Sequence, residues 1–233
     1  GDAGFYHTYT GNNKGMLTYS FTGATHASLD DITANLGRDW MFLETLYRIY
    51  YIAGYNIAHI DVTAKLCEDN DIRYQDVDRI EAVVNWMETQ YPSPAFPSRR
   101  EDGAARQGGT AYFTAYGIVK RGYPLTRGRK LEAKDDPPEV LELMHRVNIV
   151  PSHRMTLFGP HITIFTKDGK SYSRQSTGRE FIWDYDGLAA RLQEVIPSLP
   201  IPAAEYGAIV DACRALEESD RADALVKLTL KQG

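Results

Sequence analysis

The spacing of apolar residues divides much of the chain into predicted helices. Ile57, Ile60, Ala64 and Cys67 recur at intervals of three or four residues, which places them on one face of a helix over 57–67. The same kind of spacing, with helix-start signals, predicts further helices at 29–36, 110–119, 140–147, 185–195, 203–217 and 221–230.

Apolar residues at every second position predict strands in the middle of the chain. Ile80, Ala82 and Val84 alternate with charged residues within 77–88. Residues 161–166 alternate likewise, and Asp168-Gly169 then predicts a tight hairpin turn. The remaining strand predictions are 40–51, which is rich in aromatic and β-branched residues, 147–151, and 170–174 as the return strand of the hairpin.

These elements predict an α+β fold in which helices flank a central section of mixed helices and strands. The chain beyond residue 185 carries no strand signal, and its three amphipathic helices must pack their apolar faces on other helices. The first 35 residues offer little for that purpose. We therefore expect a helical partner, either in another chain or in a segment removed from this one.

Composition narrows the class of protein. The chain has 233 residues, of which 43% are hydrophobic and 24% charged, with a net charge of −5 and no long basic stripe, which argues against a nucleic-acid partner. Only two cysteines occur, which fits a reducing compartment. No apolar run reaches the roughly 20 residues that a membrane span requires. We expect a cytoplasmic protein with no membrane partner.

Several common site motifs do not occur in the sequence. The six histidines show no metal-ligand spacing, and two cysteines are too few for a cysteine zinc site. Gly108-Gly109 lacks the surrounding pattern of a phosphate-binding loop. Cys67 and Cys213 have no neighbouring base and are expected to be small core side chains.

Residues 135–173 carry a more specific pattern. A helix opening with Asp-Pro leads into the strand Val147-Asn148-Ile149-Val150-Pro151 and then into the Asp-Gly hairpin. This order resembles the C-terminal region of the MmgE/PrpD family, the 2-methylcitrate dehydratases and cis-aconitate decarboxylases. Weaker resemblances extend over nearly the whole chain, at 4–11, 36–40, 76–80 and 194–230.

The resemblance covers only the second half of a family member. It implies a helical segment at 1–37, a lid-like α+β domain at 38–182, and C-terminal helices of the helical domain at 183–233. The family's first half, a helical domain with an Asp/Thr/His group used in catalysis, has no counterpart here. The resemblance therefore implies a lyase whose active site is completed by a helical N-terminal-half chain, in a homo- or hetero-oligomer that needs no metal or organic cofactor.

The resemblance also indicates where substrate contacts would fall. Aligning the family pattern K-x-Y-P-x-C-x-x-x-H-x-x-x-D on Asp61 puts Arg48 at the lysine, Ala53 at the Cys/His position and Ile57 at the histidine. Arginine suits a carboxylate, whereas alanine and isoleucine have no proton to give. His59 lies two residues beyond the expected histidine. We take Arg48 and His59 as the candidate catalytic residues.

Tyrosine and threonine hydroxyls are the candidate substrate-binding groups, namely those of Tyr50, Tyr51, Tyr55, Thr110 and Tyr112. Each candidate also has a structural interpretation. Arg48 could pair with Glu44 on the surface, and His59 could be a buried, hydrogen-bonded side chain. The tyrosines could be core aromatics that need one hydrogen bond each.

Two functions follow from these residues. The first is the C-terminal half of a lyase, a hydro-lyase or carboxy-lyase that acts on a small carboxylate substrate in complex with the missing half. The second is a non-catalytic partner that has kept the fold, lost the chemistry at Ala53 and Ile57, and stabilises or regulates a catalytic homologue.

Overall fold

The computed structural model describes residues 33–40, 42, 47–50, 52–89, 109–124, 136–199, 201–221 and 223–230. The contacts divide the chain into two compact units. The first contains the sheet and the helices packed on it and ends at Ile182. The second contains the described residues from Trp183 onward, together with Ile49, Tyr50 and Pro124. The fold is α+β, as the sequence predicts.

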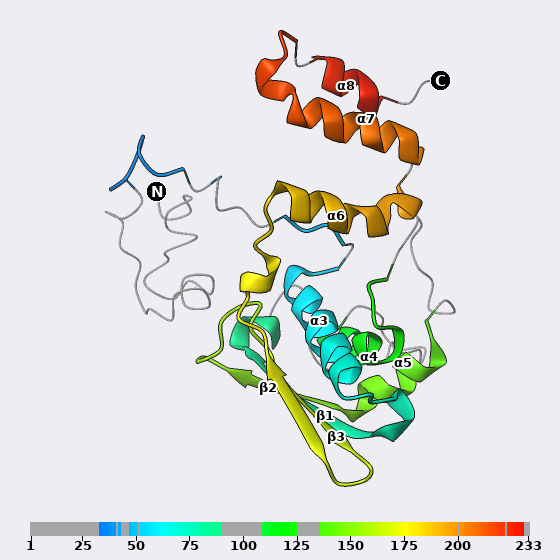
Figure 1. Cartoon of the computed structure of the whole chain (residues 1–233). Coiled ribbons are helices and arrows are strands. Elements are labelled where there is room, and N and C mark those ends of the chain that lie inside the picture. Colours follow the sequence, from blue (N-terminus) through cyan, green and yellow to red (C-terminus); the bar gives the residue numbers. More distant parts are fainter. Residues whose placement is uncertain are drawn as a thin grey trace, which may run out of the picture. The chain divides into compact units, whose positions relative to one another are not determined.

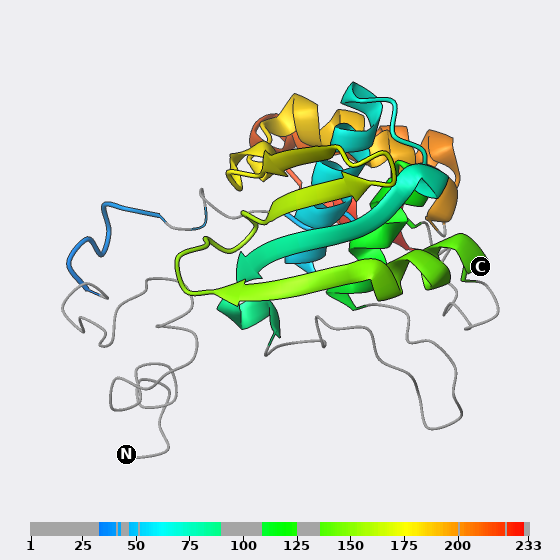
Figure 2. The ribbon, with the colours of Figure 1, turned by 90° about the horizontal axis from the view of Figure 1, so that it is seen from below.

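The first unit is built on a four-stranded mixed sheet with the strand order β2-β1-β3-β4 (Figure 2). The central strand β1 pairs in parallel with β2 and antiparallel with β3, and β3 pairs antiparallel with β4. The strands are β1 (Val77–Asn85), β2 (Val147–Ser152), β3 (His161–Thr166) and β4 (Ser171–Gln175). The sheet is therefore mostly antiparallel, with one parallel pair.

Alternation along the strands gives the sheet one covered face. Ile80, Ala82 and Val84 of β1 are buried, as are Ile162 and Ile164 of β3, while the intervening residues are exposed or half-buried. A strand projects successive side chains to opposite faces. The opposite face carries charged and polar residues, among them Arg79, whose guanidinium lies 3.5 Å from the ring centroid of Phe165.

Helices cover the apolar face of the sheet (Figures 1 and 2). They are α3 (Gly54–Asp69), α4 (Thr110–Lys120) and the short α5 (Pro138–Leu143). α3 contacts β3 and β4, α4 contacts β2, and the two helices contact each other extensively. A Cβ atom added at Gly117 of α4 would lie 2.7 Å from the Ile60 carbonyl oxygen of α3, so glycine allows the two backbones to approach closely.

The β3–β4 connection is the hairpin that the sequence predicts. Gly169 has φ 84°, in the left-handed region that glycine adopts without a steric penalty. The amide of Thr166 donates to the Lys170 carbonyl at 2.9 Å, and the amide of Gly169 donates to the Thr166 carbonyl at 2.9 Å. The loop is thus Lys167 to Gly169, the three-residue kind that ends in a left-handed residue.

The second unit contains the three C-terminal helices, α6 (Tyr185–Val195), α7 (Ala203–Arg214) and α8 (Asp223–Thr229). Only Val195 and Tyr206 are buried on these helices, and the large apolar residues Tyr185 and Val226 are exposed. Across the described ranges, no helix has both the length and the apolar character needed to cross a membrane.

Several element boundaries differ from the sequence prediction. The helix predicted at 140–147 ends at Leu143, and the 3-10 turn Met144–Arg146 leads from it into β2. The helix predicted at 203–217 ends at Arg214, and a short 3-10 turn follows it. Trp40, Phe42 and 47–50 are not in a strand, although one was predicted within 40–51. Half of the helix predicted at 29–36 lies outside the described residues, and the described half, 33–36, is a turn.

Candidate functional site

His59 lies inside the first unit, paired with a carboxylate. It is on α3, and its Nε2 atom is 3.0 Å from Oε2 of Glu88, in the 3-10 turn Trp86–Thr89 that follows β1. Both side chains are fully buried. Burial of a charge is costly unless it is paired and hydrogen-bonded. Each of the two side chains therefore needs the other as its partner. A buried histidine beside a carboxylate is also a common arrangement for proton transfer.

The other ring nitrogen of His59 contacts a hydroxyl of α4. Nδ1 is 2.8 Å from Oγ1 of Thr114, which itself donates to the carbonyl oxygen of Thr110 at 2.8 Å. Thr110 and Thr114 are both fully buried. The predicted residues His59 and Thr110 are therefore joined through Thr114, and the three elements α3, α4 and the turn after β1 meet at the imidazole ring.

The three elements that meet at this ring also carry buried polar atoms that are left unsatisfied. Neither side-chain atom of Asn56 makes a hydrogen bond with the described residues, and the same holds for Oε1 of Glu88 and Oγ1 of Thr110. All three side chains are fully buried. Buried polar groups in native proteins nearly always have a partner, so these atoms mark a place where a further group could bind. We call Asn56, His59, Glu88, Thr110 and Thr114 the His59 cluster.

Two of the predicted tyrosines are buried elsewhere in the first unit. The Tyr112 hydroxyl donates to Oδ1 of Asp136 at 3.0 Å, and its ring contacts Phe113 edge-on. Two residues along a helix turn a side chain by about 200°, so Tyr112 points away from the side of α4 that carries Thr110 and Thr114. Tyr55 is buried at the start of α3.

Two more of the predicted residues, Tyr50 and Arg48, also lie outside the His59 cluster. Tyr50 belongs to the second unit, and its hydroxyl donates to Oε2 of Glu194 at 2.9 Å. Burial raises the pKa of the Tyr50 hydroxyl well above its usual range, and the bond to Glu194 raises it further. Arg48 is exposed to solvent. Tyr51, and Glu44, the surface partner considered for Arg48, lie outside the described residues.

Sequence reasoning did not single out Glu88 or Thr114. Glu88 lies 29 positions from His59 and Thr114 lies 55 positions from it. One local signal existed, because Thr114 follows Thr110 by one helical turn, and polar residues at that spacing within an otherwise apolar helix indicate a polar buried stripe. Glu88 carries no comparable signal, since a carboxylate at the end of a predicted strand is ordinarily solvated.

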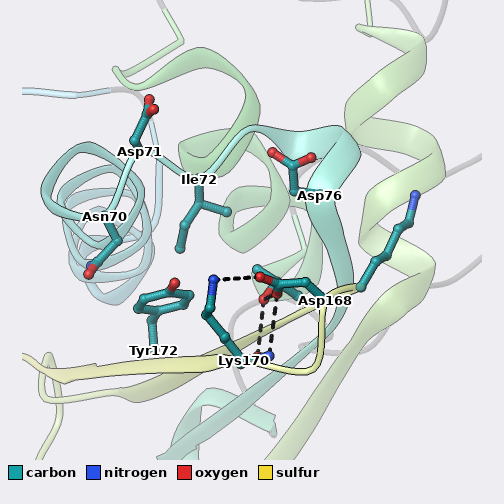
Figure 3. A pocket seen from close by; sticks show the side chains of 9 residues that line it. Asn70, Asp71, Ile72, Asp76, Asp168, Lys170 and Tyr172 are labelled. Carbon is teal, nitrogen blue, oxygen red and sulfur yellow. Dashed lines mark hydrogen bonds and ion pairs between the residues drawn. The ribbon is translucent and has the colours of Figure 1, made fainter.

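A separate pocket lies at the hairpin end of the sheet, with a volume of about 330 Å³ (Figure 3). Nζ of Lys170 is 2.7 Å from Oδ2 of Asp168, whose other oxygen accepts from Thr166 at 2.5 Å. These bonds lower the pKa of the Asp168 carboxyl to about 2, with Lys170 the larger cause. The carboxylates of Asp168 and Asp76 are already paired, with Lys170 and Arg73 respectively. We therefore interpret this pocket as an ordinary charged part of the solvated surface.

No group of three or more His, Cys, Asp or Glu side chains within the described ranges is arranged to hold a metal ion. Comparison of the sequence with models of protein families and with curated proteins finds no match.

Proposed function

We propose that this chain is the α+β part of a lyase of the dehydratase or decarboxylase type, resembling the MmgE/PrpD family and acting on a small carboxylate. A helical chain would complete its active site. The observation that carries the proposal is the buried contact of His59 with Glu88 at 3.0 Å. Elimination next to a carboxylate needs a group that moves a proton, and a histidine held by a carboxylate is suited to that task.

The second support is the exposure of apolar side chains in the C-terminal helical unit. Large apolar side chains of the second unit are exposed, namely those of Tyr185, Leu216, Val226 and Leu230. Helices gain most of their stability when their apolar faces are covered, so this exposure favours a partner chain. Because the His59–Glu88 pair is fully buried, substrate would reach it only once the helical chain has rearranged its surroundings. The proposal therefore predicts no turnover by the chain alone.

Reconstitution tests the proposal. The full chain is mixed with a helical N-terminal-half chain of the MmgE/PrpD type and assayed on cis-aconitate and 2-methylcitrate. His59→Gln should lower turnover about 100-fold or more, since general acid–base catalysis is worth about 10²–10⁴-fold. His145→Gln is the matched control, because His145 is exposed. Circular dichroism establishes that both variants are folded.

A second candidate is favoured by the same burial. His59 is fully enclosed, and Ala53 and Ile57 occupy the positions where the family has its proton carriers. A non-catalytic subunit that stabilises or regulates a catalytic homologue would have these features. Under this second candidate, turnover of the reconstituted pair is the same for the wild-type chain and for folded His59→Gln. Arg48→Ala, which should raise KM if Arg48 binds a substrate carboxylate, would then also have no effect.

A further inference from the structure

The hydrogen bonds around the His59 cluster limit which chemical groups its unsatisfied atoms can bind. We propose that Asn56, Glu88 and Thr110 form a buried site for one small neutral hydroxyl group beside His59, and that water from the solvent is its simplest occupant. The site does not depend on the lyase reaction proposed above.

The protons of the pair can be counted. The Thr114 hydroxyl has a single proton, and it donates this proton to the Thr110 carbonyl oxygen at 2.8 Å. Its oxygen can then only accept from Nδ1 of His59, 2.8 Å away, so Nδ1 carries a proton. The contact between Nε2 and Oε2 of Glu88 needs one more proton, located on the ring or on the carboxyl group. In both arrangements the pair has no net charge.

The proton count limits what can bind to Glu88. Oε1 of Glu88 accepts hydrogen bonds whether the shared proton lies on the ring or on Oε2, so the occupant must donate. The Asn56 amide offers two N–H donors and one acceptor oxygen, and satisfying its donors needs an occupant that also accepts. A hydroxyl group does both. A carboxylate group has no proton to donate to Oε1, and an ammonium group cannot accept from Asn56.

Helix geometry brings these residues to one level. Asn56 precedes His59 by three residues on α3, and Thr110 precedes Thr114 by four on α4, so each pair shares a face of its helix. His59 contacts Thr114, and one turn further on in both helices Gly117 packs against the hydroxyl of Thr63. The two helices therefore advance in the same direction, lying side by side in Figure 1, and Asn56 and Thr110 correspond one turn before the His59–Thr114 contact.

Replacement of Asn56 by leucine tests the site through the sign of the change in Tm. The two side chains are similar in size, but leucine has no polar atom. If the amide binds a hydroxyl group, Asn56→Leu removes those bonds, leaves Glu88 without its donor, and lowers Tm by at least about 2 °C, given that about 2–4 °C corresponds to one such interaction in a chain of this size. If the amide has no partner, the variant raises Tm, and the proposal is wrong. Asn148→Leu, on exposed β2 surface, is the matched control and should change Tm little.

A high-resolution crystal structure of the full unmodified chain gives a second, independent result. A water oxygen within hydrogen-bonding distance of both Asn56 and Oε1 of Glu88 supports the proposal. A direct bond between Asn56 and Glu88, or a dry contact, overturns it. Neither measurement involves turnover, so a negative outcome here leaves the reconstitution experiment to be judged separately.

Discussion

At the scale of single residues, the Asp168 carboxyl shows how the residues of one short turn lower a pKa. Asp168 lies in the hairpin loop, where Lys170 and Thr166 both contact its carboxylate. These partners favour the ionised form. The side chain that makes the turn recognisable in the sequence also fixes the turn through hydrogen bonds to its own neighbours.

We predict that the Asp168 carboxyl titrates near its pKa of about 2 instead of the ordinary 3.8. Because the pKa is lowered in the folded chain, its contribution to stability is present above pH 3.8 and is lost as pH falls toward 2. Lys170→Ala should move the midpoint upward toward 3.8, measured by ¹³C NMR of the side-chain carboxyl carbon. Lys65→Ala, which removes only the exposed pair with Asp69, should leave it unchanged. An unchanged midpoint in Lys170→Ala would show that Lys170 is not the cause.

At the scale of elements, the contact of α3 with α4 organises both the core and the His59 cluster. The two helices meet at Gly117, where the Ile60 carbonyl of α3 leaves no room for a side chain. One turn earlier, His59 meets Thr114 across the same contact. Gly117 therefore allows the close separation of the two helices, and the contact of His59 with Thr114 depends on that separation.

Gly117→Ala should destabilise the chain by about 1–3 kcal/mol, the usual cost of overpacking a core, even though alanine is the better helix former. The added methyl group would lie 2.7 Å from the Ile60 carbonyl oxygen. Gly207→Ala in α7 is the control, because nothing lies within 4 Å of its Cβ position. It should stabilise its helix by about 0.5–1 kcal/mol. Urea unfolding measures both, and equal effects of the two substitutions would contradict the close contact.

At the scale of the whole molecule, the two units differ in how well they bury their apolar residues. The first unit has a continuous core between its sheet and helices. Among the described hydrophobic residues of the second unit, only Tyr50, Val195 and Tyr206 are buried, and Leu216, Val226 and Leu230 remain exposed. Helices with apolar faces gain little stability unless those faces are covered. The second unit is therefore where we expect a partner chain to bind.

We predict that the chain associates through these helices with a helical chain or with a second copy of itself. Val226→Asp combined with Leu230→Asp should weaken that association at least tenfold, because a charge at a buried apolar contact is strongly unfavourable. Size-exclusion chromatography with light scattering measures the assembled mass. Glu217→Gln, which changes another exposed residue of the second unit, is the control. A chain that stays monomeric at all concentrations and with the helical half present would contradict this prediction.

The local elements could be predicted from the sequence because their causes lie within a few residues. The apolar spacing of 57–67 defines α3, and the alternation of Ile80, Ala82 and Val84 defines β1. Asp168-Gly169 defines the hairpin, since glycine reaches the φ of 84° that the turn needs. Each of these patterns depends on side chains no more than four residues apart, so no knowledge of the tertiary fold is required.

Tertiary structure alone decided which distant residues meet. The parallel pairing of β1 with β2, the contact of His59 with Glu88, and the left-handed φ of 64° at Phe158 have no local cause. The Phe158 ring packs where Gly54 leaves space, since a Cβ there would be 2.8 Å from the ring. Such contacts join positions far apart in the chain, and their energy comes from packing that exists only once the elements have docked. The sequence therefore determined the elements and predicted His59 as a site residue. The fold placed the Glu88 carboxylate and the Thr114 hydroxyl beside it.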